Sequence, residues 1–210
     1  MIDLYTWSTP NGRKISIMLE ELKLSYNVIP VNISEGDQLR ESFLKISPNN
    51  KIPAIVDKEQ RFSLMESGAI LLYLSKKHSK FYPENDTLYW KEMEWLMFQK
   101  ASIGPMLGQA HHFLKFNKGK SSYAEERYRA EVTRLYGVLE KRLESNEYIG
   151  GKNYGITDIS TWPWISRFEW HEADIKKYKN VCNWYTKIAE RTAVKMGYDK
   201  PATGASIPIP

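Results

Sequence analysis

Apolar positions follow two different periods along the chain, and the change between them falls near residue 80. Before it, short apolar runs typical of strands occupy residues 2–7, 26–33, 54–56 and 62–64. Helical spacing separates these runs, with patterns that start at Arg13, Gln38 and Ser67. The residues between the first strand and the first helix, 8–12, form a turn cluster. This order of elements predicts a small mixed sheet whose first two strands are parallel.

After residue 86 only the helical period remains. Helical patterns occupy residues 88–113, 123–143, 156–168 and 181–192, and Gly104-Pro105 should kink the first of them. Residues 80–86, which include Pro83, are expected to be a linker, and the tail from Gly197 is expected to be irregular. The sequence therefore predicts two domains, an α/β domain over residues 1–79 and an all-helical domain over residues 87–210.

Composition narrows the class of partner without defining it. The chain has 210 residues, of which 42% are hydrophobic and 26% charged, as in ordinary globular proteins. The net charge is +5, but the basic residues are scattered among 25 acidic ones, so nucleic-acid binding is disfavoured. No apolar run reaches the roughly 18 residues of a membrane span. Because Met1 leads directly into a strand pattern, we expect no secretory signal.

The cysteine and histidine residues are poorly placed for chemistry of their own. Cys182 is the only cysteine, and its helical, apolar surroundings are typical of a buried structural thiol. A single cysteine excludes an internal disulfide and fits a reducing compartment such as the cytoplasm. His111 and His112 are adjacent and would point about 100° apart on a helix, and no cysteine–histidine group has zinc spacing. We expect no metal, and any thiol chemistry should use a thiol brought by a ligand.

Residues 49–67 have the features of a peptide-binding edge. Pro53 stands immediately before a strand, and because proline cannot donate to a sheet ladder, such a position usually has a structural reason. Ser67 suits the N-cap of the following helix, whose free N–H groups attract anions. Glu66 could bind a ligand ammonium and Lys51 a carboxylate, although both also fit an ordinary turn or helix end. This stretch could therefore hold a peptide by its backbone and its carboxylate together.

The turn between the first strand and the first helix is a second candidate. The Asn11 amide and the Thr9 hydroxyl would be donors beside the positive end of a helix, and such groups lower the pKa of a thiol. The alternative is a plain turn, since Asn-Gly and a threonine cap are common there.

Two other polar residues have no role defined by their context. Gln38 stands at a helix start, and Arg127 lies on a helix where it could pair with Glu131. The chain contains no nucleophile elbow, phosphate loop or dinucleotide fingerprint.

Three motifs together carry a resemblance that covers essentially the whole chain. They are Ile52-Pro53 before a strand, Glu66-Ser67-Gly68 opening a helix, and Gly155-Ile156-Thr157-Asp158 opening a later one. In these motifs the chain resembles the cytosolic glutathione transferases, which have a thioredoxin-like first domain followed by an all-α helical bundle. The runs at residues 9–12, 47–57, 104–112 and 126–128 look most like the nu class, the bacterial disulfide-bond reductases related to the fungal nitrogen-regulator prion protein.

The resemblance implies that glutathione, or its disulfide, is bound at matching positions. Thr9 and Asn11 would face the sulfur as catalytic residues, and the catalytic tyrosine of other classes is not carried over to Tyr5, where a buried strand aromatic is expected. One position departs from the family pattern, because Gly155 replaces the usual serine or threonine cap and should weaken a local stability device. The other implied contacts are Gln38 and Lys51 at the glycine end, Ile52 and Pro53 (expected cis) at the cysteinyl unit, Glu66 and Ser67 at the γ-glutamyl group, and Arg127 from the helical domain.

The function that follows is a glutathione-dependent disulfide-bond reductase, in which bound glutathione thiolate attacks a disulfide. Two alternatives remain open at this point: conjugation of glutathione to electrophiles, and a non-enzymatic regulatory module on the same fold. The fungal relative carries a long disordered extension, whereas this chain begins at its first strand, which favours an enzyme. The resemblance also implies a homodimer, and the apolar positions of the helix from Leu88 could line either an interface or a core.

Overall fold

The computed structural model describes residues 1–210 and contains two compact units. The first unit comprises residues 1–80 and 190–207, and the second comprises residues 81–189 and 208–210. The expected helical domain extends from residue 87 to the end of the chain, whereas residues 190–207 pack with the first unit. The sequence pattern does not show that residues 190–207 pack with the first unit. A helical period shows which face of a helix is apolar, but not which domain that face packs against.

The first unit is built on a four-stranded mixed sheet with the strand order β2-β1-β3-β4. β1 is parallel to β2 and antiparallel to β3, and β3 is antiparallel to β4. The predicted mixed sheet and its initial parallel crossover are confirmed. The strands are β1 (Ile2–Thr6), β2 (Tyr26–Pro30), β3 (Ala54–Asp57) and β4 (Phe62–Met65).

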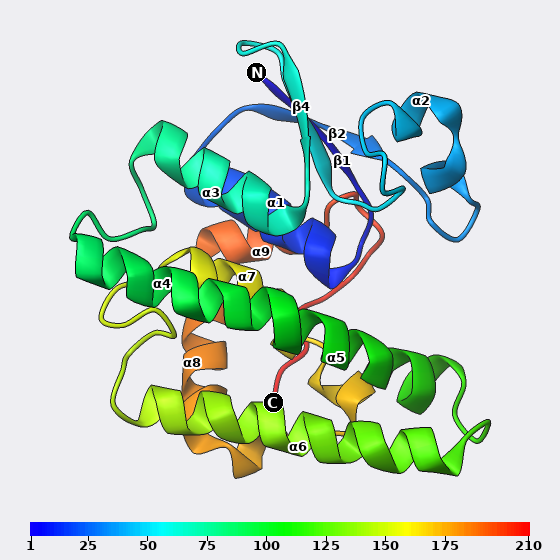
Figure 1. The fold of residues 1–210 in the computed structure, drawn as a ribbon, viewed down its shortest axis with the longest axis vertical. Coiled ribbons are helices and arrows are strands. Elements are labelled where there is room, and N and C mark those ends of the chain that lie inside the picture. Colours follow the sequence, from blue (N-terminus) through cyan, green and yellow to red (C-terminus); the bar gives the residue numbers. More distant parts are fainter. The chain divides into compact units, whose positions relative to one another are not determined.

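Helices cover both faces of this sheet (Figure 1). α1 (Pro10–Glu21) and α3 (Ser67–His78) pack together on one face. α2 (Glu41–Leu44) follows a short 3₁₀ helix (Asp37–Leu39) and lies over the other face, where its Phe43 ring contacts Tyr5 at a centroid distance of 6.1 Å. Tyr5 packs in the strand but is only partly buried, whereas the sequence predicts a buried aromatic there.

The C-terminal helix α9 (Thr192–Tyr198) packs along α1 within the first unit. The two backbones approach so closely that a Cβ on Gly197 would lie 2.7 Å from the Ile17 Cα. The Ser16 hydroxyl donates to the Gly197 carbonyl at 2.6 Å. Only glycine fits this contact, so Gly197 permits the close packing of α9 on α1.

The second unit is entirely helical, as predicted. Its first helix, α4 (Asp86–Phe98), does not break at Gly104-Pro105 but continues into α5 (Gly104–Ala110) through a π-helical turn. In this turn the Gly104 N–H donates to the Gln99 carbonyl five residues earlier. A wider turn of this kind is a common cause of a local bend. The elements are α4 (Asp86–Phe98), a π segment (Gln99–Ile103), α5 (Gly104–Ala110), a π segment (His111–Phe116), α6 (Ser122–Glu144), α7 (Ile156–Ile165), two 3₁₀ turns (Phe168–His171 and Ile175–Lys177) and α8 (Lys179–Ala189).

α7 is the central helix of this unit, because all of its residues are buried. It packs against α4 and α8, while α6 packs against α5 and α8 (Figure 1). Helix α6 begins at a conventional cap, where the Ser121 hydroxyl accepts from the Ala124 N–H at 3.3 Å. No helix of the chain is both long enough and apolar enough to cross a membrane.

The start of α7 is capped by a side chain from another helix. Gly155 occupies the N-cap position, and Asp158 accepts from the Gly155 N–H at 3.0 Å and from the Ile149 N–H at 2.9 Å. The Glu92 carboxylate of α4 accepts from the Thr157 N–H at 2.8 Å, as a serine or threonine cap would do. Glu92 therefore replaces the acceptor that Gly155 lacks, and the expected local weakness is offset.

This arrangement requires glycine at the cap and places two carboxyl groups in the core. A Cβ on Gly155 would lie 2.6 Å from Glu92 Oε1, and one on Gly150 would overlap Glu92 Oε2. Burial raises the pKa of Glu92, and burial together with the nearby Glu92 raises the pKa of Asp158 to about 7. The residues at positions 92 and 155 are therefore interdependent, because the Glu92 carboxylate fills the space that a side chain at residue 155 would need.

We expect Gly155→Ser to destabilise the wild-type chain by about 1–3 kcal/mol, because the new side chain collides with the Glu92 carboxylate. In a Glu92→Ala background the same substitution should be neutral or stabilising, since the serine hydroxyl can then cap α7. Urea unfolding of the four chains of this cycle measures the coupling. Gly137→Ser is the matched control, because nothing lies within 4 Å of its new Cβ. Additive effects of the two substitutions would contradict the account.

A buried chain of hydrogen bonds crosses the core of the second unit. His111 Nε2 lies 2.9 Å from His171 Nε2, and the Tyr136 hydroxyl lies 2.9 Å from His171 Nδ1. All three side chains are buried. Burial and the nearby Arg167 cation lower the pKa of His111 to about 4, and burial is also the main reason that the pKa of His171 lies well below its usual value. Both rings are therefore neutral in the folded protein at neutral pH.

These lowered pKa values make folding sensitive to acid in a defined direction. The unfolded chain binds protons at its histidines below about pH 6.5, whereas the folded protein binds one at His111 only near pH 4. His111 therefore stabilises the fold less as the pH falls through this window. The buried Asp158 acts in the opposite direction, because its raised pKa favours the folded state as the pH falls.

The comparison of wild type with His111→Phe isolates the contribution of His111. The difference in unfolding free energy between them should shrink by about 2 kcal/mol from pH 7.5 to pH 4.5, because only the wild type pays for excluding that proton. Unfolding followed by tryptophan fluorescence is a suitable measurement, since Trp164 stacks on His111. The exposed His112, replaced by Phe, is the control and should show no such trend. A pH-independent difference for His111→Phe would contradict the pKa assignment.

Candidate functional site

The register of the sheet brings three chain segments to one edge. Tyr5 of β1 is opposite Ala54 of β3, and Ala54 is opposite Met65 of β4. β1 and β4 therefore end where β3 begins. The turn after β1, the residues before β3 and the residues after β4 meet at this edge.

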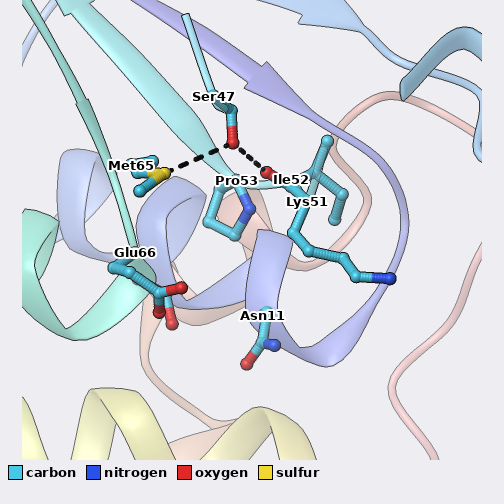
Figure 2. Close-up of a pocket in the computed structure, with 8 residues that line it drawn as sticks. Asn11, Ser47, Lys51, Ile52, Pro53, Met65 and Glu66 are labelled. Carbon is cyan, nitrogen blue, oxygen red and sulfur yellow. Dashed lines mark hydrogen bonds between the residues drawn. The ribbon is translucent and has the colours of Figure 1, made fainter. Parts of the chain in front are cut away.

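A pocket of about 140 Å³ lies there, within the first unit. Figure 2 shows its residues, with Asn11 and Glu66 near Pro53 and with Ser47 bonded to its neighbours. The structure thus brings together six of the nine residues that the sequence singles out. The pocket is lined by Asn11, Ser47, Lys51, Ile52, Pro53, Met65, Glu66 and Ser67.

The segment that enters β3 is held in shape by Ser47. Its buried hydroxyl donates to the Lys51 carbonyl at 2.9 Å and lies 3.8 Å from the Met65 sulfur (Figure 2). The Ile52-Pro53 peptide bond is cis, as expected. Ile52 lies outside the β1–β3 and β3–β4 pairings, both of which begin at Ala54 on β3.

The start of α3 differs from the expected cap. Ser67 is the first residue of the helix and Glu66 takes the N-cap position, so the prediction of Ser67 as the N-cap is wrong. Glu66 has φ 69° and ψ 111°, an unusual backbone conformation for a residue other than glycine. It redirects the chain from the strand into the helix within one residue, while Ser67 is buried in the pocket wall. The first N–H groups of an α-helix do not bond within the helix, and such a helix start can bind an anion.

The start of α1 also lies earlier than the apolar pattern indicates. The helix begins at Pro10, so residues 10–12 form its first turn and not a separate loop. Thr9 is the N-cap, and its hydroxyl accepts from the Gly12 N–H at 3.2 Å. Gly12 has no room for a side chain, since a Cβ would lie 2.3 Å from the Trp7 carbonyl oxygen. Proline in the first turn and a threonine cap are standard start signals that outweigh the absence of apolar spacing.

Asn11 and Thr9 consequently differ in their relation to the pocket. Asn11, half-buried in the first turn of α1, lines the pocket. Thr9 is not among the lining residues, and its hydroxyl oxygen is engaged as a helix cap. A hydroxyl that accepts one hydrogen bond can still donate another.

Gln38 and Arg127 do not line this pocket. Gln38 lies in the 3₁₀ helix before α2, and its Oε1 is buried without a hydrogen-bond partner in the chain. Arg127 is an exposed residue of α6 in the second unit, where it lines a different hollow of about 610 Å³ with residues that include Tyr123 and Met106. Glu131, the proposed partner of Arg127, forms its ion pair with Arg134 at 2.7 Å.

Two lining residues, Ser47 and Met65, were not predicted from the sequence. Met65 could have been found from strand alternation, because it is the last residue of β4 and directly precedes Glu66. Ser47 has no local signal of this kind, since a Ser-Pro-Asn-Asn run predicts only a turn. Its role depends on the carbonyl and the sulfur that the fold places beside it.

The β3–β4 hairpin is fixed to α3 at its far end by Asp57. This buried carboxylate accepts from Lys77 Nζ at 2.7 Å and from the Tyr73 hydroxyl at 2.5 Å. Burial alone would raise the pKa of Asp57, but Lys77, Tyr73 and two backbone N–H donors together hold it well below its usual range. The carboxylate is therefore charged at neutral pH and connects the hairpin to the helix that forms the pocket wall.

No group of three or more histidine, cysteine, aspartate or glutamate side chains in the chain is arranged to hold a metal ion. Cys182 is a free, half-buried thiol of α8 in the second unit. The pocket itself contains no cysteine. Its polar groups are an amide, two hydroxyls, a lysine, a glutamate and the backbone of a helix start, which together suit a ligand carrying both charges and an extended backbone.

Comparison with known proteins identifies the class to which this fold and pocket belong. Residues 4–83 match the model of the glutathione S-transferase N-terminal domain, and residues 100–192 match that of the C-terminal domain. The chain belongs to the glutathione S-transferase family.

Individual relatives are similar over nearly the whole chain. The disulfide-bond oxidoreductase YfcG of Escherichia coli is 45% identical over 212 residues, which cover 99% of this chain and 94% of that protein. A glutathione transferase from Burkholderia graminis, solved with two glutathione molecules per subunit, is 40% identical with a TM-score of 0.90, covering 97% of this chain and 89% of its own. One from Pseudomonas putida, solved with one glutathione disulfide per subunit, is 36% identical with a TM-score of 0.90, covering 96% of this chain and 92% of its own.

Proposed function

We propose that this protein is a glutathione-dependent disulfide-bond reductase. The single observation that carries the proposal is the composition of the pocket, which joins the segment that leads into β3, the start of α3 and the Asn11 amide without any cysteine. The naming of YfcG as a disulfide-bond oxidoreductase supports the same reaction, as does the glutathione disulfide bound to the Pseudomonas putida relative.

The binding half of the proposed site is the stretch from Lys51 to Ser67. The Ile52 backbone would pair with the cysteinyl unit of glutathione, beside Pro53 in the pocket lining. Ser67 and the first N–H groups of α3 would bind the γ-glutamyl carboxylate, and Glu66 would bind its ammonium. Lys51 is exposed at the pocket and suits the glycine-end carboxylate.

The catalytic half would be the start of α1. The Asn11 amide can donate to the glutathione sulfur, and the Thr9 hydroxyl keeps a hydrogen to donate while it caps the helix. Donors at a helix N-terminus stabilise a thiolate more than a thiol, so the pKa of the bound thiol falls. The protein supplies the electrostatic environment, and the substrate supplies the sulfur.

The reaction proposed is a pair of thiol–disulfide exchanges. The glutathione thiolate forms a bond to one sulfur of a disulfide and the other sulfur leaves as a thiolate, which takes up a proton. A second glutathione then attacks the mixed disulfide, so that two glutathione molecules are oxidised to their disulfide while the substrate is reduced to two thiols. Two glutathione molecules are bound per subunit in the Burkholderia graminis relative.

Two residues outside the pocket complete the proposed set. Gln38 would contact the glycine end of glutathione, where its amide N–H₂ group can donate to the carboxylate. Arg127 is kept as a proposed ligand contact because of the family resemblance, and its side chain is exposed on α6.

We further propose that the protein belongs to the nu class, works in the cytoplasm and is a homodimer. The disulfide-bond oxidoreductase relatives support the class. A single cysteine, Cys182, supports a reducing compartment. Leu88, Trp90 and Met97 of α4 are large apolar side chains with half or more of their surface exposed, which supports α4 as part of an interface with a second copy.

The reaction type can be tested with two substrates side by side. Hydroxyethyl disulfide should be reduced with glutathione at a substantially higher rate than an aromatic chloride of the chlorodinitrobenzene type is conjugated. Cys182→Ala should retain full disulfide reduction, because the attacking sulfur belongs to glutathione. Conjugation without disulfide reduction would establish a transferase, and no turnover of either substrate would favour a regulatory module. A large loss of activity in Cys182→Ala would instead assign the thiol to the protein.

The role of Asn11 can be tested by titrating the thiol of bound glutathione through its thiolate absorbance. Asn11→Ala should raise the pKa of that thiol by about one unit and lower kcat/KM by about 10- to 100-fold, since one donor to the developing charge is lost. Ser67→Ala is the matched control and should weaken glutathione binding without moving the thiol pKa. An unchanged thiol pKa in Asn11→Ala would remove Asn11 from the catalytic half.

A further inference from the structure

Arg13 is a charged side chain that is completely buried next to the proposed catalytic turn. It is the fourth residue of α1 and has 0% of its surface exposed. An arginine is almost never fully buried unless its charge and its donors are satisfied, because desolvating a cation is costly. The sequence pattern places Arg13 at a helix start without assigning it a purpose. Its contacts show what it connects.

The guanidinium links the turn before α1 to the last residue of α9. Its Nε donates to the Tyr198 carbonyl at 2.8 Å, and its Nη2 donates to the Ser8 hydroxyl at 2.9 Å. The Cζ atom also lies 3.7 Å from the centre of the Tyr198 ring, within the range of a cation–π contact. One planar side chain thus holds Ser8, the residue before the Thr9 cap, against the C-terminal helix.

The helix α9 is held to α1 at the opposite end by a different arginine. Arg191, just before α9, donates to both carboxylate oxygens of Glu21 at 2.6 and 2.8 Å. Glu21 is the last residue of α1, whereas Arg13 lies in its first turns. The two arginines therefore make comparable connections between the same two helices, but only Arg13 reaches the turn at residues 8–11.

We propose that Arg13 is a positioning residue for the reaction, which fixes the turn carrying Thr9 and Asn11 by holding Ser8 against Tyr198. The proposal rests on the proposed function, in which that turn faces the glutathione sulfur. Arg13 supplies two donors in a fixed planar fork as well as a stacking face, and a lysine at the same position can reproduce the charge but not this geometry. The C-terminal helix, remote in sequence, thereby becomes part of the support for the catalytic half.

Loss of the Arg13 contacts should affect turnover and not the binding of glutathione. The binding half is carried by Lys51–Ser67 on other elements, so loss of the Arg13 fork should move the thiolate donors without disturbing the contacts that hold glutathione. Arg13→Lys should lower kcat by about 10-fold, since a displacement of about 1 Å at a reacting group can reduce the rate by about 100-fold. The KM for glutathione should stay within about threefold of wild type, and the pKa of the bound thiol should rise by about half a unit.

Arg191→Lys is the matched control, because it also breaks a paired arginine contact between α1 and α9. Arg13→Lys should lose more stability in urea unfolding, because Arg13 is completely buried and Arg191 is partly exposed, but Arg191→Lys should keep the wild-type thiol pKa and kcat. Ser8→Ala is a milder second variant that removes only one contact of Arg13, and it should shift the thiol pKa and kcat in the same direction as Arg13→Lys. This arm keeps the test valid if Arg13→Lys does not fold.

Two results would overturn the proposal. One is a wild-type thiol pKa and kcat in both Arg13→Lys and Ser8→Ala, which would reduce Arg13 to a structural contact. The other is an equal change of thiol pKa in Arg191→Lys, which would show that general loosening of α9 is responsible. Asn11→Ala measured in parallel separates this failure from that of the proposed function. If Asn11→Ala moves the thiol pKa and Arg13→Lys does not, only the positioning role is lost.

Discussion

The antiparallel pairing of β1 with β3, continued by β4, is the constraint on which the site depends. The register that places Tyr5 opposite Ala54, and Ala54 opposite Met65, makes two strands end where a third begins. Because side chains alternate along a strand, a slip of one residue would exchange the two faces of β3 and misalign the segments that follow. The core enforces this register, since Leu4 and Ile55, which pair across it, are completely buried. The hydrophobic core of the first unit thus decides which polar groups meet at its edge.

A pocket assembled in this way can activate a thiol without supplying one. The groups around it are neutral donors, a helix start and charges suited to the ends of a peptide, and the only cysteine of the chain lies in the other unit. Thr9 has an established structural role, because its hydroxyl caps the first turn of α1, the turn that carries the pocket residue Asn11. The buried Arg13 connects the start of α1 to the C-terminal helix α9. That helix belongs to the first unit, although it follows the second unit in the sequence.

Much of the fold can be predicted from the sequence, because strand and helix periods are local properties. The sheet, its parallel crossover and the helical second unit follow from such periods, and the motifs around Pro53 and Glu66 indicate most of the pocket. Most of the wrong or missing predictions concern features that depend on contacts between residues far apart in the sequence. The cap at Gly155 is weak in the local sequence, but Glu92 completes it from another helix. The destination of α9 depends on a backbone contact at Gly197, and Ser47 depends on the carbonyl and sulfur beside it. The starts of α1 and α3 differ for a local reason, since cap and backbone signals outweigh apolar spacing.

The central claim is that this edge binds glutathione and ionises its thiol with groups that carry no sulfur. Calorimetric titration at pH 7, in two buffers of different ionisation enthalpy, counts the protons released on binding. Free thiols of this kind are mostly protonated at that pH, since their pKa lies near 8.5. The account predicts that glutathione releases about half a proton or more on binding, whereas S-methylglutathione, which has no thiol to ionise, binds with no such release. Equal proton release for the two ligands would contradict it.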